Sequence, residues 1–341
     1  GHSSLAEGYS STAVGSGARA ENAFDLAAGY QAIASGGQST AVGFGSKSKG
    51  FASNAIGHSS LAEGYSSTAV GSGAHAEKAF DLAAGYQAIA SGEQSTAIGN
   101  NTIATGNSSV SIGTGAQATG KQSISVGTGN VVSGDNSGAF GDLTTISGTG
   151  SYSTGNNNTI TTNNTFVVGN NVTKTLDNSV FLGNNAAYTA KGASTDGDAA
   201  VTEPVTVGGT LTYGGFAGKT PVGVVTVGDV GKERRIQNVA AGLISATSTD
   251  AINGSQLYAT NAKLGNVANT VKENFGGNAT LNPDGSITYT NIGNTGKDNI
   301  HDAIKAATTK VEEGAGIKVD PTKNADGSTT YTVSAKTDGT T

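Results

Sequence analysis

The sequence predicts a mostly β, fibrous fold, in which a solenoid of 14-residue coils over residues 1–190 is followed by short coiled-coil segments. The first observation is a glycine that recurs at every fourteenth position, without a gap, from Gly1 to Gly183. A fixed period this short is typical of a solenoid in which each repeat is one coil. The second observation is a heptad-like spacing of seam residues from Leu257 to Phe275, which predicts a coiled coil.

Each coil is expected to hold two short strands and two tight turns, because a unit of this length is too short for a helix pair or a βαβ unit. The residue before the glycine is usually apolar, as in Ile112, and the fifth residue after it is small or apolar, as in Ala90. These positions often alternate with polar ones, which is the period of a strand. The repeated glycine suits a positive φ or a close approach of two backbones. Coils stacked in this way would form a parallel sheet on each face.

The interior of such a stack would hold little apolar side-chain volume. Ordering one residue costs roughly 1 kcal/mol or more in backbone entropy, whereas burying one Val or Ile returns only about 1.5–3 kcal/mol. A single coil therefore cannot stand alone, and a stack filled mainly with Ala and Ser gains little from its own core. We expect the coils to be buried against other chains.

Composition and charge exclude several classes of function. The chain has 53 Gly and no Cys, so disulfides and thiolate chemistry are absent, and the strict repeat argues against disorder. The formal charge of −6 is spread evenly, which argues against a nucleic-acid partner. The sequence has no signal peptide and no long, unbroken apolar run, so we expect no membrane span. Because the repeat is already running at the first residue, we expect a fragment of a longer protein.

Residues 1–43 and 57–99 are near-duplicates that lie four coils apart. Duplication without divergence suits a spacer or a repeated display surface, since an enzyme has little use for two copies of its site. From residue 100 to residue 185 the coils become rich in Asn and Thr, whose short side chains can bond neighbouring turns in a ladder.

The 14-residue period breaks at Lys191. Residues 191–219 are expected to form an excursion with two strands, at 205–207 and 211–213, before a last coil-like piece at 222–228. Two hairpins are expected further on, one over residues 278–291 and one that pairs residues 316–319 with 329–333.

Two helical seams flank the first of these hairpins. A helix with one apolar stripe needs partner helices. Asn261 in the first seam is either a device that sets register or oligomeric state, or an anion ligand. The first seam consists of Leu257, Asn261, Leu264, Ala268, Val271 and Phe275, and the second of Ile300, Ile304, Ala307 and Val311.

Three features of the sequence resemble the trimeric autotransporter adhesins with a YadA-like head. They are coils such as STAIGNNTIATGNS (95–108), the pair ERRIQNVAAG (233–242) and DAINGSQL (250–257), and Phe275-Gly276-Gly277, which looks like the family's FGG motif. The resemblance covers nearly the whole chain, and the pair of neck motifs is its most specific part. The Asn-rich, duplicated style is similar to the long multi-head adhesins of Acinetobacter.

The resemblance implies a parallel homotrimer with left-handed β-roll heads, a neck and a three-stranded coiled coil. It also implies a separate C-terminal barrel, missing from this chain, that anchors the protein in the outer membrane at the bacterial cell surface. The implied function is non-enzymatic attachment to host matrix proteins, host cells or abiotic surfaces, and autoagglutination. The implied domains are a head (1–190), a head insert and final coil (191–230), a neck (231–257), a coiled coil (258–275), an FGG-type insertion (276–295), a coiled coil (296–313) and a β-rich stalk segment (314–341).

The same resemblance assigns a structural role in the neck to Arg234, Arg235, Ile236, Asn238, Val239, Asp250, Asn253, Gln256 and Leu257. Phe275, Gly276 and Gly277 would end the helix and let the coiled coil resume. The basic cluster of Lys232, Arg234 and Arg235 is expected to pair between chains, with Asp250 or Glu233, or alternatively to form a ligand patch.

Repeated aromatic residues are the candidate ligand-binding residues. Tyr30 and Tyr86 follow repeat glycines, whereas Tyr9 and Tyr65 lie near the opposite turn. If these side chains point outward, they form a repeated surface suited to multivalent contact. If they point inward, they fill the end of the head or the trimer seam.

No catalytic residue, metal or cofactor is expected. The histidines form no cluster, and no pair of carboxylates is placed by its spacing at the distance that acid–base catalysis needs. A trimeric phage-type fibre and a purely structural spacer remain alternatives. A β-helix enzyme would cluster carboxylates and aromatics on one face, and an ice-binding solenoid would carry unbroken ranks of Thr, so neither matches this repeat.

Overall fold

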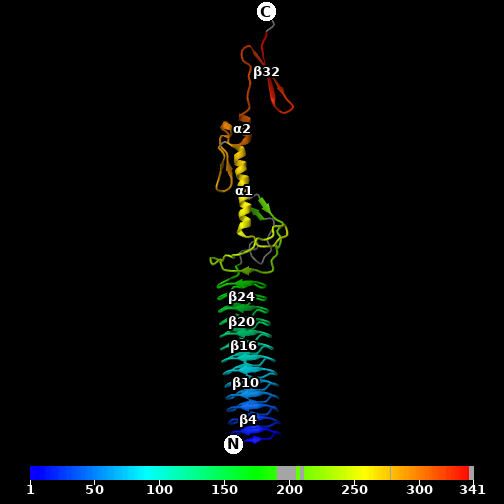
Figure 1. Ribbon diagram of the computed structural model, residues 1–341, viewed down its shortest axis with the longest axis vertical. Helices are drawn as coiled ribbons and strands as arrows, with labels where there is room; N and C mark the ends of the chain where they lie inside the picture. The colour runs from blue at the N-terminus through cyan, green and yellow to red at the C-terminus, as the bar shows by residue number, and fades with distance from the viewer. Residues whose placement is uncertain (190–204, 208–210, 277, 338–341) are drawn as a thin grey trace. The chain divides into compact units, whose positions relative to one another are not determined.

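The computed structural model describes residues 1–189, 205–207, 211–276 and 278–337 (Figure 1). By internal contacts the chain divides into two compact units. We call Gly1–Gln237 with Ser245–Thr249 the roll unit, and Asn238–Ile244 with Asp250–Thr341 the helix unit. Each unit is described by itself.

The roll unit is built mainly from two parallel sheets, which we call sheet A and sheet B. Sheet A has 12 strands: β1 (Leu5–Ala6), β3 (Arg19–Ala20), β5 (Ile33–Ala34), β7 (Lys47–Ser48), β9 (Leu61–Ala62), β11 (His75–Ala76), β13 (Ile89–Ala90), β15 (Ile103–Ala104), β17 (Gln117–Ala118), β19 (Val131–Val132), β21 (Thr145–Ile146) and β23 (Thr159–Ile160). Sheet B has 14 strands: β2 (Thr12–Val14), β4 (Leu26–Ala28), β6 (Thr40–Val42), β8 (Asn54–Ile56), β10 (Thr68–Val70), β12 (Leu82–Ala84), β14 (Thr96–Ile98), β16 (Val110–Ile112), β18 (Ile124–Val126), β20 (Gly138–Phe140), β22 (Tyr152–Thr154), β24 (Phe166–Val168), β25 (Val180–Leu182) and β28 (Val225–Thr226).

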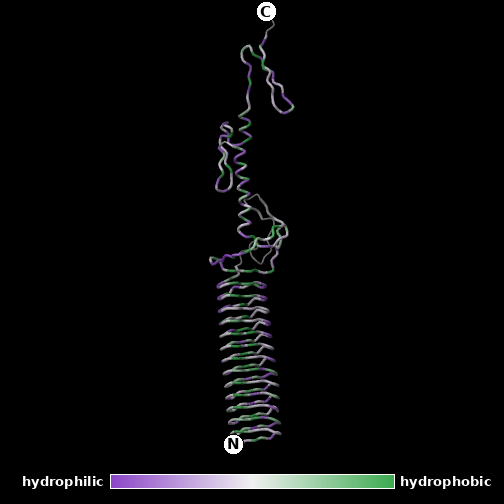
Figure 2. Tube along the Cα trace, viewed as in Figure 1, coloured by the Kyte–Doolittle hydropathy of each residue, from purple (hydrophilic) through white to green (hydrophobic). Residues whose placement is uncertain are grey.

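Successive coils stack in register. Thr68 pairs with Leu82 in sheet B and His75 with Ile89 in sheet A, each partner lying one coil further along the chain. The predicted solenoid is therefore confirmed, and Figure 2 shows hydrophobic and hydrophilic residues recurring from coil to coil.

The repeat glycines meet both conditions that the sequence suggested. Twelve of them have φ between 112° and 143°. A Cβ added to Gly85 would also meet the backbone carbonyl of Gly99 in the next coil. A second row of glycines, represented by Gly106 in the unit STAIGNNTIATGNS (95–108), lies at the opposite turn. There a Cβ on Gly106 would meet the carbonyl of Gly120.

The core of the roll changes in size along the chain. The inward residue of most strands up to Ala118 is Ala or Ser. Beyond this point the buried residues become larger and include Val132, Ile146, Ile160 and Phe181. The interior of the earlier coils is therefore as thin as the composition predicted.

The last strand of sheet B comes from much later in the chain than the strand with which it pairs. Val180 of β25 pairs with Val225 of β28, so residues 225–226 form the last strand of sheet B. The two strands expected in the excursion form an antiparallel pair, β26 (Val205–Val207) and β27 (Leu211–Tyr213). Residues 190–204 and 208–210 of this excursion lie outside the described residues.

The helix unit contains α1 (Gly254–Phe275), the hairpin of β29 (Thr280–Leu281) and β30 (Ile287–Thr288), the 3₁₀ turn η1 (Ile292–Asn294), α2 (Ile300–Ala306), and the hairpin of β31 (Ile317–Lys323) and β32 (Thr329–Ala335). The second seam was expected to continue to Val311, whereas α2 ends at Ala306. Short helices are unstable without tertiary packing, and the seam residue Ile304 is 67% exposed in the single chain.

Candidate interaction surfaces

The outer face of sheet B carries apolar side chains along the roll, mostly at the last residue of each strand, whereas the first residue is often polar, as in Thr40, Asn54 and Thr68. In each three-residue strand the middle side chain points inward and the two flanking side chains point outward, as in β14, where Ala97 is buried and Ile98 is exposed. We call the outward side chains of sheet B the apolar face. Its exposed members include Val14, Ile56, Val70, Ile98, Ile112, Phe140, Phe166, Val168 and Leu182. Exposed apolar side chains that recur in this way, interrupted at Thr154, mark an interaction surface.

The outer face of sheet A is mixed and carries ion pairs. Lys49 Nζ lies 2.7 Å from one oxygen of Glu63, and His75 Nε2 lies 3.2 Å from the other. His75 Nδ1 lies 3.4 Å from Glu77. The hydrogen bond from Lys49, together with His75, holds the pKa of Glu63 below its usual value, although partial burial acts in the opposite direction. This face is therefore more polar than the apolar face.

A cavity of about 340 Å³ opens on the outer side of sheet A. It is lined by Gly73, His75, Gln87, Ile89, Asn101 and Ile103. Two isoleucines thus supply an apolar wall, while an imidazole and two amides supply hydrogen-bonding groups at its rim.

Aromatic side chains gather at the two turns that join the sheets. We call the turn after each repeat glycine the glycine edge and the other turn the opposite edge. Tyr30 and Tyr86 at the glycine edge are 48% and 51% exposed, and Tyr9 and Tyr65 at the opposite edge are 77% and 52% exposed. In the single chain all four predicted aromatics therefore point away from the core.

The structure adds two aromatic residues that sequence reasoning did not single out, Phe44 and Phe51, and it brings the surface histidine His58 into contact with one of them. At the glycine edge, Tyr30 stacks on Phe44, and Phe44 stacks on His58. At the opposite edge, Phe51 stacks on Tyr65. The signal was available, because rings one repeat apart in the sequence must lie one above the other in such a solenoid.

Phe24 and Phe80 at the opposite edge occupy a costly backbone conformation. Their φ angles are 61° and 62°, a region that bulky L-residues rarely adopt. Both side chains are also more than half exposed. The same left-handed conformation recurs at this turn position in other coils, as at Ser10, Gln38 and Gln94, so it is a property of the turn itself.

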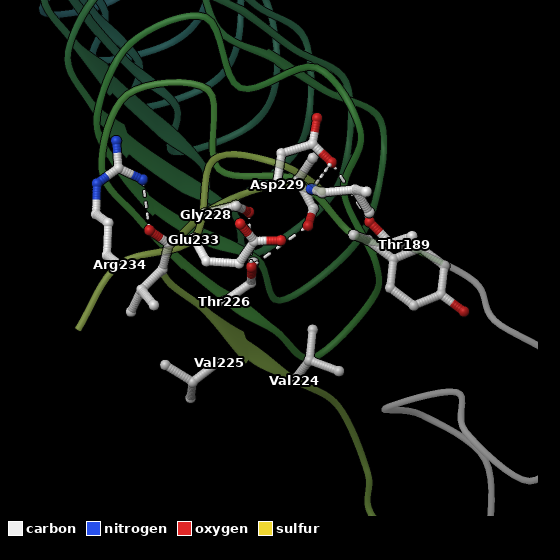
Figure 3. Close-up of a pocket in the computed structure, with 12 residues that line it drawn as sticks. Thr189, Val224, Val225, Thr226, Gly228, Asp229, Glu233 and Arg234 are labelled. Carbon is white, nitrogen blue, oxygen red and sulfur yellow. Dashed lines mark hydrogen bonds between the residues drawn. The ribbon is translucent and has the colours of Figure 1, made fainter. Parts of the chain in front are cut away.

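A second cavity, of about 430 Å³, lies at the end of the roll where β28 returns (Figure 3). The guanidinium of Arg234 borders it and donates hydrogen bonds to the carbonyls of Val227 and Asn184. Gly183 leaves room for this guanidinium, since a Cβ there would lie 3.0 Å from Arg234 Cζ. Within one chain Arg234 therefore binds backbone carbonyls of the roll unit, whereas Arg235 and Ile236 are exposed.

Three more of the predicted neck residues form hydrogen bonds that connect the region at the start of α1 to the segment before it. The side chain of Asn253 caps the helix and donates to the carbonyl of Val239 at 3.1 Å. Gln256 accepts from the backbone NH of Gly242 at 2.9 Å and donates to its carbonyl at 2.7 Å. Asp250 accepts from the backbone NH of Leu243 at 2.9 Å.

Two other predicted neck residues belong to the same unit. Asn238 adopts a left-handed backbone with φ of 59°, and Leu257 is 59% exposed. Figure 1 shows α1 as the long helix to which Leu257 belongs.

Helix α1 ends at the predicted FGG motif. The backbone NH of Gly276 bonds the carbonyls of Lys272 and Glu273, and Gly276 has φ of 56°. The ring of Phe275 packs edge-on against Tyr289 of the following hairpin, at 5.4 Å between centroids. Gly277 lies outside the described residues.

Within the described part of the chain, no three His, Cys, Asp or Glu side chains gather as metal ligands would. None of its helices combines the length and the apolar character that crossing a membrane requires.

Two family models match different parts of the chain, one the coils of the roll and the other the segment that contains α1. The model of the YadA head domain repeat matches residues 1–18, 6–27, 20–46, 49–74, 76–102, 104–130 and 118–143. The model of the coiled stalk of trimeric autotransporter adhesin matches residues 235–280.

Three curated relatives match shorter stretches. Trimeric autotransporter adhesin AtaA of Acinetobacter sp. strain Tol 5 is 46% identical over 111 residues, which is 30% of this chain and 3% of that protein. Autotransporter adhesin BtaE of Brucella suis biovar 1 is 51% identical over 81 residues, 24% of this chain and 11% of BtaE. Autotransporter adhesin EhaG of Escherichia coli O157:H7 is 39% identical over 124 residues, 35% of this chain and 7% of EhaG. The chain thus spans a small part of each relative.

Among solved structures, the C-terminal YadA-like domain of BPSL2063 from Burkholderia pseudomallei is similar at 31% identity and a TM-score of 0.27. The match covers 46% of this chain and 59% of that one. Since both the head-repeat and the stalk model match, and the three relatives are all autotransporter adhesins, the chain belongs to the trimeric autotransporter adhesins.

Proposed function

We propose that three copies of this chain assemble in parallel, with the apolar face of each roll turned toward the other two. Leaving a stripe that includes Ile98, Ile112 and Phe140 in water would be costly, at about 25 cal/mol for each Å² of apolar surface. The thin Ala and Ser core cannot offset this cost from within one chain. The seam residues of α1 support the same state, because Leu257, Leu264 and Phe275 are all exposed in the single chain.

The proposed role of this assembly is attachment. The trimer would hold a bacterial cell to host matrix proteins, host cells or abiotic surfaces, and would let cells clump, by many weak contacts along the head. The observation that carries this proposal is the pair of duplicated segments that present exposed aromatic rings, with Tyr9 and Tyr30 repeated as Tyr65 and Tyr86. In this role the protein would lie at the cell surface and would be held there by an outer-membrane anchor.

The domain limits given above are part of the proposal. Residues 1–190 would serve as the head and residues 231–257 as the neck that narrows it onto the stalk. The hydrogen bonds from Asn253 and Gln256 to the carbonyls of Val239 and Gly242 support a structural role for the neck, since they connect the preceding segment to the start of α1.

Adhesion is tested with the whole chain and a variant in which Tyr9, Tyr30, Tyr65 and Tyr86 are all replaced by Ser. A matched control replaces the exposed Thr114 and Thr128, which occupy the glycine edge of later coils, with Ser. Binding to immobilised collagen, fibronectin, laminin and bare plastic is measured for all three. We expect the wild type and the control to adhere and the tyrosine variant to lose most of its binding.

Two results would contradict the proposal. If the wild-type chain adheres to none of these surfaces, this part of the protein is a structural spacer. If the tyrosine variant adheres as well as the control, the attachment does not use the aromatic edges.

A further inference from the structure

The glycine edge carries a stack of three rings with two open ends. Tyr30 and Phe44 lie 5.1 Å apart at 15°, and Phe44 and His58 lie 5.1 Å apart at 8°. Because the rings stack along the direction in which the coils stack, the free face of His58 points to the next coil. That coil carries Ser72 and Gly73 at its turn instead of a ring.

The ladder of rings resumes one coil later with Tyr86. Backbone bonds keep the turns in register, from Gly73 NH to the His58 carbonyl and from Gln87 NH to the Ser72 carbonyl, both at 2.9 Å. We call the space beside Ser72, between His58 and Tyr86, the Ser72 slot. Its two ends are two coils apart, which corresponds to roughly 9.6 Å at the usual strand spacing.

The chain itself shows that such a step admits a ring. Phe44 fills the equivalent two-coil step between Tyr30 and His58 and contacts both. In the Ser72 slot the side chain at this position is a hydroxymethyl group, which fills less of the step than the ring of Phe44 does.

The Ser72 slot adjoins the cavity on the outer side of sheet A. Gly73 and Gln87, which line that cavity, directly follow Ser72 and Tyr86 in the chain. The slot has the free ring face of His58 at one end and Tyr86 at the other. Ser72, Gln87 and Asn101 supply hydrogen-bonding groups beside them. None of these lining residues is a Lys, Arg, Asp or Glu.

We propose that the Ser72 slot and its adjoining cavity bind a sugar ring of a neutral glycan. A slot with one ring at each end and amide, hydroxyl and imidazole groups along its side matches a ligand with two apolar faces and a polar rim. The step of roughly 4.8 Å per coil is wider than a flat ring needs and leaves room for a puckered, saturated ring. The lining has no Lys or Arg, and its His75 pairs with Glu63 and Glu77, so a neutral ligand is favoured over an acidic one. This inference names a ligand class for the adhesive head and so rests on the proposed function.

The first duplicated segment provides an internal comparison. His2, Ser16 and Tyr30 repeat the slot, but Arg19 and Lys47 stand where the second segment has His75 and Ile103. The apolar wall thus keeps Ile33 but loses its second isoleucine, and the rim gains two positive charges, so we expect the Ser16 slot to contribute less binding than the Ser72 slot.

The test uses the whole chain with cellotetraose and chitotetraose as neutral glycan probes and N-acetyl-tyrosinamide as an aromatic probe. Binding is measured by isothermal titration and by saturation-transfer NMR. Ser72→Phe fills the slot with the ring that the chain uses at residue 44. Thr114→Phe is the matched control, because it adds a ring at the same edge in a coil away from the slot.

We expect at least one glycan to bind the wild type, and Ser72→Phe to weaken that binding by about tenfold or more, because the added ring occupies the slot. Thr114→Phe and Ser16→Phe should stay within about twofold of the wild type. The proposal is overturned if neither glycan binds, if Ser72→Phe and Thr114→Phe behave alike, or if the aromatic probe binds the slot more tightly than either glycan.

Adhesion measured in parallel separates the two proposals. A chain that adheres to surfaces but binds no glycan overturns the sugar site and leaves the adhesive function standing. A chain that binds a glycan at the Ser72 slot but adheres to no surface supports the sugar site and overturns the adhesive function.

Discussion

Asp25 and Asp81 are buried carboxylates at equivalent positions of the two duplicated segments, each 1% exposed. Asp81 accepts from the backbone NH of Lys78 at 2.8 Å and from the NH and hydroxyl of Ser95, one coil further on, at 2.8 and 2.9 Å. Asp25 makes the same bonds in its own segment. A single residue thus joins two coils through the interior.

Replacing Asp81 with Ala should destabilise the roll, because it leaves buried donors on Lys78 and Ser95 without partners. The expected loss in free energy of unfolding is about 2–4 kcal/mol, measured by chemical denaturation. Asp135→Ala is the matched control, since Asp135 also bonds the neighbouring coil but is exposed. An equal effect of both substitutions would mean that burial does not make the Asp81 network costly to break.

The two hairpin turns of the helix unit each contain an aspartate that accepts the same pair of hydrogen bonds from a serine two residues further on. Asp284 accepts from the NH and hydroxyl of Ser286, and Asp326 from those of Ser328. The hydroxyl, and then the NH, holds the pKa of each aspartate below its ordinary value of 3.8. The charged carboxylate therefore stabilises the hairpin above that value, and its contribution is lost as the pH falls through the lowered pKa.

Ser328→Ala should raise the pKa of Asp326 toward its ordinary value by removing the hydroxyl donor. NMR titration of the aspartate side chains measures this change, and Asp284 in the other hairpin serves as an internal control. An unchanged pKa of Asp326 would show that the hydroxyl bond does not form in solution.

At the scale of elements, α1 begins with a capping box. Asn253 accepts from the helix backbone, and the Gln256 side chain accepts from the backbone NH of Asn253. Asn253→Ala should cost about 1 kcal/mol and lower the helical circular dichroism signal. Asn266→Ala, at an exposed mid-helix position, should leave that signal unchanged or raise it. Loss of helix in both variants alike would contradict the capping role.

The periodic elements could be predicted from the sequence, and the direction of their side chains could not. A 14-residue glycine period requires stacked coils, and the DG-containing turns at Asp284 and Asp326 place both hairpins. Whether Tyr30 faces in or out depends on turn geometry, which repeats alone do not specify. The bond of Arg234 to the carbonyl of Asn184 joins residues 50 positions apart, which local sequence pattern cannot predict.

At the scale of the roll unit, the core grows from Ala to larger residues. The inward residue of sheet A is Ala104 in β15 but Ile146 in β21. An added methylene stabilises by about 0.8 kcal/mol when buried, so coils around residues 132–168 should open less often than coils around residues 20–104. Backbone amides of the former should exchange at least about tenfold more slowly.

Ile146→Ala combined with Ile160→Ala should reduce this difference in hydrogen exchange, because it restores the small core of the earlier coils. Uniform exchange along the wild-type roll would show that core size does not control local opening.

The central claim is that the apolar face holds three chains together, and sedimentation equilibrium tests it most directly. The wild-type chain should have three times the mass of one chain. Ile98→Asp with Ile112→Asp, on the apolar face, should dissociate the trimer, whereas Ile89→Asp with Ile103→Asp, on the outer side of sheet A, should leave it assembled. A folded wild-type monomer, or dissociation by the second pair alone, would contradict the account.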